Sequence, residues 1–179
     1  MRLHRILTAL LIMVIISPLA PRNVSADCSV PRSVTVSGIS MHPLISDGQT
    51  VTVLFGFYQC NPILRGDTVL LDVGGRVYVK TVKALPKDRF HLERTDAGYL
   101  LLINKKAGLT SLGTPYVLHE AKARMLLLYE RDYKGVIPDD AFLVLGNQPD
   151  GTIDSTRYGL IGKTNIKGRV ALQDFSYTR

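Results

Sequence analysis

From Ser33 onward, short runs rich in β-branched and aromatic residues alternate with turn residues. Runs of this length, bounded by Gly, Pro, Asn and Asp, are typical of strands rather than helices. The pair Gly74-Gly75 separates two of them by a tight hairpin turn. We therefore predict a mainly β fold, a single complex β-domain of short strands. The expected strands cover residues 34–36, 51–55, 68–71, 76–80, 90–92, 99–103 and 141–145.

Residues 120–129 fit either a short helix or a strand, because the spacing of their apolar residues matches neither the helical nor the strand repeat clearly. The 179 residues suit one domain with enough length to bury a core. Repeats and low-complexity segments are not visible in the sequence. One folded domain over residues 27–179 is therefore expected.

The first 26 residues differ from the rest of the chain in composition, with a basic start followed by an apolar run. Arg2 and Arg5 precede an almost wholly apolar run at 6–20, which is short for a spanning helix of ~20 residues and typical of a signal-peptide core. Val24-Ser25-Ala26 supplies small residues for cleavage before Asp27. Residues 1–26 are therefore expected to be a signal peptide or an uncleaved N-terminal membrane anchor. Either alternative places the remainder in the periplasm or on the extracytoplasmic face of the cytoplasmic membrane.

The net charge of +7 partly reflects this leader. Without Arg2, Arg5 and Arg22 there remain 19 basic and 15 acidic residues, a net charge of +4. The basic residues form no stripe with interleaved aromatics, so nucleic acid is not an expected partner. A mild attraction to anionic lipid headgroups makes the membrane surface the expected partner.

The two cysteines, Cys28 and Cys60, both lie in the exported part. In an oxidising compartment such a pair is expected to form a disulfide. No His or acidic cluster stands near them at metal-ligand spacing, so neither a metal nor another cofactor is expected.

Ser40 is the candidate nucleophile, since it follows the strand at 34–36 and precedes Pro43, which stops that strand. A Ser nucleophile needs a base to take its proton. The histidines suggest no triad: one is in the leader, one is two residues from Ser40, and two lie in ordinary polar–apolar alternation. They are His4, His42, His91 and His119.

A lysine with a lowered pKa is the other base that can serve, as in Ser–Lys variants of the triad. Lys80 ends the apolar strand at 77–79, where burial would disfavour its charged form. Lys83 and Lys87 follow in what the sequence suggests is a solvated turn.

Four groups of residues follow one another along the chain from about Gly38 to Val170. They are Ser40-Met41-x-Pro43, Gly66-Asp67-x-Val69, Tyr78-Val79-Lys80 with Leu85-Pro86-x-Asp88, and Gly146 with Asp154-Ser155 and Gly159. In this order they resemble the type I signal (leader) peptidases of family S26, Ser–Lys endopeptidases that also include maturation proteases of conjugative-transfer systems. A lone Ser-Met-x-Pro is a weak signal, but the ordered set is specific.

The resemblance implies that Ser40 is the nucleophile and Lys80 the general base. It also implies that the substrate lies as an extended strand between residues 35–39 and 76–79, a case of β-augmentation. Shallow apolar pockets would accept small side chains such as Ala one and three residues before the cut. The residues expected to contact the substrate are Val36, Ile39, Tyr78 and Val79.

The same resemblance assigns supporting roles. Thr152 stands where the family has a hydroxyl that orients the lysine, and Asp154 where it has a structural carboxylate, with Arg157 as a possible partner. Gly38 replaces a serine that often completes the oxyanion hole. That leaves the Ser40 backbone N–H and Ser37 as candidate donors, each typically worth ~3 kcal/mol.

Gly146-Asn147-Gln148-Pro149 lacks the charges of the family's Gly-Asp-Asn-Arg. We therefore expect a serine endopeptidase that removes leader peptides from exported precursors, specialised for a conjugation or pilus system. The alternative is a catalytically inactive β-domain of the same fold that binds peptides or assembly partners. Self-cleaving repressors share the dyad, but the export segment and the lack of a helix-turn-helix argue against them.

Overall fold

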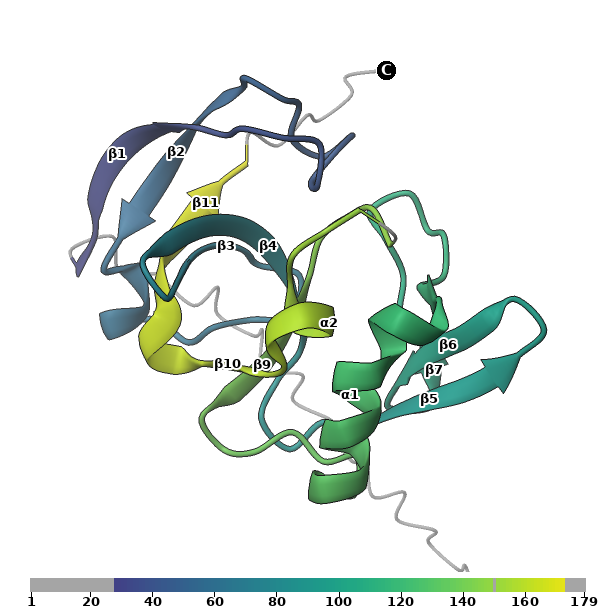
Figure 1. The fold of residues 1–179 in the computed structure, drawn as a ribbon. Coiled ribbons are helices and arrows are strands. Elements are labelled where there is room, and N and C mark those ends of the chain that lie inside the picture. Colours follow the sequence, from purple (N-terminus) through teal and green to yellow (C-terminus); the bar gives the residue numbers. More distant parts are fainter. Residues whose placement is uncertain (1–27, 150, 173–179) are drawn as a thin grey trace, which may run out of the picture.

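The computed structural model describes residues 28–149 and 151–172, so the expected signal peptide or anchor at 1–26 lies outside the described residues. Most of the strands form one curled antiparallel sheet, which fills the left half of Figure 1. Its order is β1 (Val30–Thr35), β2 (Thr50–Phe55), β11 (Ile166–Ala171), β3 (Thr68–Val73), β4 (Arg76–Ala84), β9 (Ala141–Leu145) and β10 (Ile161–Gly162).

A smaller sheet stands beside the first and carries α1 (Glu120–Tyr133), the longest helix among the described residues, on one side (Figure 1). The short helices are η2 (Phe57–Gln59), α2 (Ser155–Tyr158) and η3 (Lys163–Asn165). Within the described ranges no helix has the length and apolarity needed to cross a bilayer. The strands of the smaller sheet are β5 (Phe90–Thr95), β6 (Gly98–Ile103), β7 (Lys106–Ala107) and β8 (Val117–Leu118).

The mainly β prediction is confirmed, and each expected strand overlaps a strand of the structure. Gly74 and Gly75 both adopt positive φ in the β3–β4 hairpin, a conformation that glycine reaches without strain. Residues 120–129, whose apolar spacing favoured neither a helix nor a strand, lie in helix α1. The expected strand at 34–36 begins earlier, at Val30, and ends at Thr35.

The central strand β11 was not predicted. It lies between β2 and β3, although its sequence carries Gly168, a residue that weakens strands. A Cβ at this position would lie 2.6 Å from the Leu54 carbonyl oxygen, so the close approach of β2 requires glycine here.

The outer edge of β1 and the first half of β4 have no partner strand among the described residues. β1 pairs only with β2, and β4 pairs with β9 only from Thr81 onward. Residues 76–80 of β4 therefore have β3 on one side and an open edge on the other. Unpaired backbone N–H and C=O groups of this kind are the template that an added strand uses.

An apolar cluster joins these two edges. Val36, which follows β1, packs with Met41 and Ile45 of the next turn and with Val79 of β4, and all four side chains are buried. Burial of each such side chain contributes ~1.5–3 kcal/mol. This packing fixes the segment that carries Ser40 against the strand that carries Lys80.

The expected disulfide between Cys28 and Cys60 is present and ties the start of β1 to the loop after η2. It spans a sequence separation of 32 residues. Closing a loop of that length removes entropy from the unfolded chain, so the double variant Cys28→Ser/Cys60→Ser should lose about 3–4 kcal/mol in free energy of unfolding. Urea unfolding of the oxidised protein and the variant checks this, and a loss under ~1 kcal/mol would contradict it.

Candidate active site

The side chains of Ser40 and Lys80 are in direct contact, although the residues are 40 positions apart. Lys80 Nζ donates to Ser40 Oγ at 2.8 Å and to the carbonyl oxygen of Val79, also at 2.8 Å. Ser40 is half-buried at the start of a turn, whereas Lys80 is only 2% exposed. The pair therefore has the spacing that proton transfer from a serine to a lysine requires.

Burial lowers the pKa of Lys80 to about 8, because an ammonium loses its hydration inside the protein. Two nearby charges act in opposite directions: the Asp154 carboxylate raises this pKa and the Lys122 ammonium lowers it. The Tyr78 ring, whose centroid lies 5.9 Å from Nζ, also faces the amine. At a pKa of about 8, about a tenth of Lys80 is neutral at pH 7 and about half at pH 8, and this neutral form is able to accept a proton.

Backbone contacts hold the turn that presents Ser40. Gly38 adopts φ +93°, and its N–H donates to Asp47 Oδ1 at 2.7 Å. After Ser40 the chain turns, with the His42 N–H donating to the Ile39 carbonyl at 3.0 Å. The conformation at Gly38 favours glycine, which gives a local reason for the absence of a side chain there.

Asn147 ties three segments of the site together, a role that the sequence did not reveal. Its backbone N–H donates to the Ser40 carbonyl at 2.7 Å, and its side-chain Nδ2 donates to the His42 carbonyl at 2.9 Å and to Ser111 Oγ at 2.7 Å. Its Oδ1 accepts from the Ser111 N–H at 2.7 Å. A neutral amide, with both donors and an acceptor, satisfies all of these partners, whereas a carboxylate could not donate.

Gly146, just before Asn147, allows two segments to approach closely. A Cβ there would lie 2.9 Å from the Ser40 carbonyl oxygen and would overlap the Thr152 side chain. The Gly146 carbonyl accepts from the buried Tyr116 hydroxyl at 2.7 Å. Ser40 and Thr152 can therefore approach this point so closely only because glycine occupies it.

Asp154 is buried and accepts four hydrogen bonds. Its Oδ2 accepts from the Gly146 N–H at 2.9 Å and from the Thr152 hydroxyl, and its Oδ1 accepts from the N–H and hydroxyl of Thr156 at 2.9 and 2.7 Å. Thr152 was expected to help orient Lys80. Its hydroxyl donates to Asp154, and no hydrogen bond joins it to Lys80 among the described residues.

The expected pairing of Asp154 with Arg157 is wrong. The Arg157 side chain is exposed, and only its backbone N–H contacts Asp154, at the carbonyl oxygen. The turn of α2 directs Thr156 toward the carboxylate and Arg157 toward solvent. Hydrogen bonds from uncharged groups therefore take the place of the ion pair.

The two candidate oxyanion donors differ in position. The Ser40 N–H makes no hydrogen bond among the described residues and is free to donate to a substrate oxygen. Ser37 is exposed, and its hydroxyl makes no contact with Ser40 in the described structure. The geometry therefore favours the Ser40 N–H as the first donor.

The four residues expected to contact substrate do not all lie together. Val36 and Val79 belong to one buried cluster, between the two open strand edges. Tyr78 points to the opposite face of β4, where its hydroxyl lies 2.7 Å from that of Tyr158. Ile39 is 66% exposed, beside Ser40 in the chain.

Lys83 was expected to be solvated, and this expectation is wrong. It lies within β4, half-buried, with Nζ donating to the Leu109 carbonyl at 2.8 Å and lying 5.3 Å from the centroid of the Tyr116 ring. Burial lowers its pKa to about 8, like that of Lys80. It has no contact with Ser40 in the described structure, so geometry rather than pKa distinguishes the two lysines.

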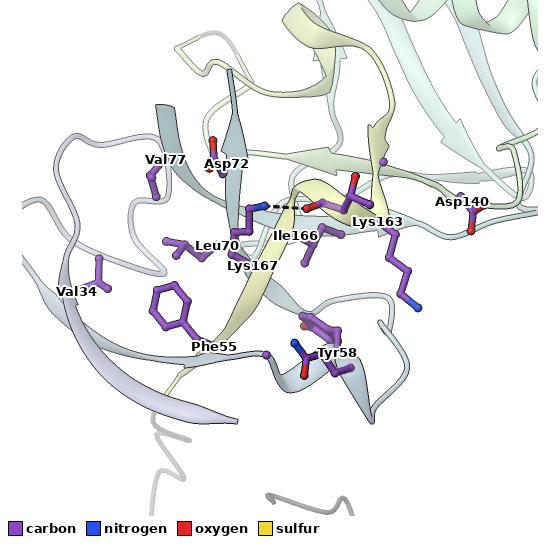
Figure 2. Close-up of a pocket in the computed structure, with 14 residues that line it drawn as sticks. Val34, Phe55, Tyr58, Leu70, Asp72, Val77, Asp140, Lys163, Ile166 and Lys167 are labelled. Atoms are coloured by element: carbon purple, nitrogen blue, oxygen red, sulfur yellow. Dashed lines mark hydrogen bonds between the residues drawn. The ribbon is translucent and has the colours of Figure 1, made fainter. Parts of the chain in front are cut away.

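A groove of about 1160 Å³ lies beside β1 and β4 (Figure 2). Neither Ser40 nor Lys80 lines it, but Val34 and Val77 do, each two residues before a member of the cluster at Val36 and Val79. Phe55 and Leu70 add to its apolar wall. The groove thus borders β1 and β4 next to this cluster.

Comparisons with known proteins identify the family of this chain. A family described as signal peptidase, peptidase S26, matches residues 3–173. Signal peptidase IB of Staphylococcus aureus strain COL is 26% identical over 161 residues, covering 80% of this chain and 78% of that protein, and the protein of strain N315 matches equally well. A solved signal peptidase I from Enterococcus faecalis V583 is 20% identical with a TM-score of 0.43, covering 62% of this chain and 98% of that one. Because the family match spans nearly the whole sequence, this chain belongs to the S26 signal peptidase family of serine peptidases.

Proposed function

We propose that the protein is a Ser–Lys endopeptidase that cuts leader peptides from exported precursors. The observation that carries this proposal is the 2.8 Å contact between Ser40 Oγ and the buried amine of Lys80. A surface lysine would stay protonated at neutral pH and could not act as a base. The burial of this one supports the neutral form that the chemistry needs.

In the proposed reaction, neutral Lys80 Nζ takes the Ser40 proton as Oγ attacks the carbonyl carbon of the scissile peptide. The Ser40 N–H donates to the resulting oxyanion. Lys80 then returns the proton to the leaving amine, and the C–N bond breaks to give an ester on Ser40. A water molecule, deprotonated by Lys80, hydrolyses this ester, and the Ser40 hydroxyl is restored.

The open edges of β1 and β4 support binding of the leader as an added strand. β1 runs toward Ser40 and β4 toward Lys80, so residues before the cut would extend back over Val36 and Val79 and into the groove of Figure 2. Little space remains beside the buried valines, which favours small residues close to the cut. The apolar wall of the groove suits the more distant, apolar part of a leader.

We place the catalytic domain on the extracytoplasmic face of the cytoplasmic membrane, beside the lipid surface where leaders emerge. The replacement of charged family residues by neutral ones around Asn147 supports a specialised substrate, such as a precursor of a conjugation or pilus system. Separate incubation with a pilin-type precursor and with a general secretory precursor tests this narrower proposal. Equal cleavage of both would contradict it.

Incubation of the purified protein with leader-bearing precursors tests the main proposal. New N-termini should appear after small residues, and Ser40→Ala should show none while retaining the wild-type melting temperature. Loss of one half-buried hydroxyl changes packing little. Equal cleavage by Ser40→Ala would refute the nucleophile assignment, and an inactive wild type would favour a peptide-binding role.

The pH dependence provides a further prediction. A general base works only when it is neutral, so kcat/KM should rise with pH and level off above an apparent pKa of about 8. Since Lys83 has a similarly lowered pKa, the profile is compared with that of Lys83→Met, which should keep the same midpoint. A midpoint near 10, or one that moves with Lys83, would contradict the assignment of Lys80.

A further inference from the structure

Lys122 lies in the first turn of α1, where that helix packs beside α2 (Figure 1). Its side chain is half-buried, and Nζ donates a hydrogen bond to the Thr152 carbonyl. This bond fixes a flexible side chain that would otherwise extend into water. The Lys122 ammonium is therefore held beside Thr152, the residue whose hydroxyl donates to Asp154.

The negative charge of Asp154 opposes the proposed role of Lys80 as a general base. Its carboxylate is buried and has no Lys or Arg within ion-pair distance in the described structure. An uncompensated negative charge near Lys80 favours the ammonium form, which cannot accept a proton. A second positive charge on the far side of Thr152 would offset this field.

We propose that Lys122 is a positioning residue that keeps the base Lys80 neutral, by placing a fixed positive charge against the field of Asp154. This inference rests on the proposed Ser–Lys function and adds a residue that keeps its base in the neutral form. It gives α1, which carries none of the family motifs, a part in the chemistry.

The charges around the site agree with this assignment. Asp154 and Lys122 are the charged groups that act on Lys80, and they act with opposite signs. Tyr78 and Tyr116 also face the region, and burial raises the pKa of the Tyr116 phenol, which keeps it neutral. Arg124 and Arg157 line a groove of about 480 Å³ with Lys122, but both are exposed, where water screens their charge.

Three substitutions separate the charge of Lys122 from its hydrogen bond. Lys122→Gln removes the charge and keeps a donor, Lys122→Met removes both, and Lys122→Arg keeps both. The Gln and Met variants should raise the apparent pKa of kcat/KM by roughly 0.5–1 unit, because a like charge near Lys80 is lost. At pH 7 their kcat/KM should fall roughly 3–10-fold, with recovery on the alkaline plateau. The Arg variant should follow the wild-type profile.

Arg124→Met is the matched control, since it removes one positive charge from the exposed side of the same helix. Its profile should keep the wild-type midpoint. If the Gln and Met variants lose activity equally at every pH with an unchanged midpoint, Lys122 is only structural and the inference is wrong. If the wild type itself fails to cleave, or Ser40→Ala cleaves, the proposed function fails instead, so the two failures are distinguishable.

Discussion

Lys80→Arg should abolish cleavage at every pH from 6 to 10. A guanidinium has a pKa above ~12 and stays protonated, so it cannot accept the Ser40 proton even where Lys80 is fully neutral. Loss of a general base lowers kcat/KM by ~10²–10⁴-fold. The larger side chain also has to fit where Lys80 is 2% exposed, which adds to the loss. Initial rates on a fluorogenic leader peptide, measured across this range, check the prediction.

Lys83→Arg provides the matched control, because Lys83 lies three residues further along β4 and has a pKa lowered to the same value. It donates to the Leu109 carbonyl and has no contact with Ser40 in the described structure. This variant should retain most of the wild-type activity. Normal cleavage by Lys80→Arg, with loss of activity in Lys83→Arg, would mean that the wrong lysine has been assigned.

Strand positions could be predicted from the sequence wherever apolar residues alternate between clear turn signals. The expected strand at 141–145 coincides with β9, and the Gly74-Gly75 turn joins β3 to β4 as expected. β11 was missed because Gly168 interrupts the usual strand composition. That glycine is needed for the close approach of the Leu54 carbonyl, a contact between distant segments that no local pattern records.

Only the parts of the candidate site that lie within the sequence motifs could be predicted from the sequence. They suggested pairing Ser40 with Lys80, and the structure places those side chains in hydrogen-bond contact. They could not predict that Lys83 is half-buried, because its burial depends on loops that pack against β4 from elsewhere in the chain. Nor could they show that α2 directs Thr156 rather than Arg157 toward Asp154, since one residue along a helix changes the direction by about 100°.

Asp154→Ala should cause the largest loss of stability among single substitutions at the site. The carboxylate accepts four hydrogen bonds, two from backbone N–H groups of Gly146 and Thr156 and two from threonine hydroxyls. Alanine would leave the buried N–H groups without a partner, at a cost of ~1–3 kcal/mol each. We expect the free energy of unfolding to fall by ~3–5 kcal/mol, with loss of activity because Gly146 no longer holds its place beside Ser40.

Asp139→Ala is the appropriate comparison, since that carboxylate is 79% exposed and its nearest cation, Lys87, lies 3.8 Å away at the surface. Surface ion pairs of this kind contribute ~0–1 kcal/mol. Urea unfolding of both variants gives the two losses directly. If Asp154→Ala loses no more stability than Asp139→Ala, the buried carboxylate does not organise the site. Asp154→Asn separates charge from packing: removal of the negative charge should lower the apparent pKa of kcat/KM, opposite to the shift expected when Lys122 loses its charge.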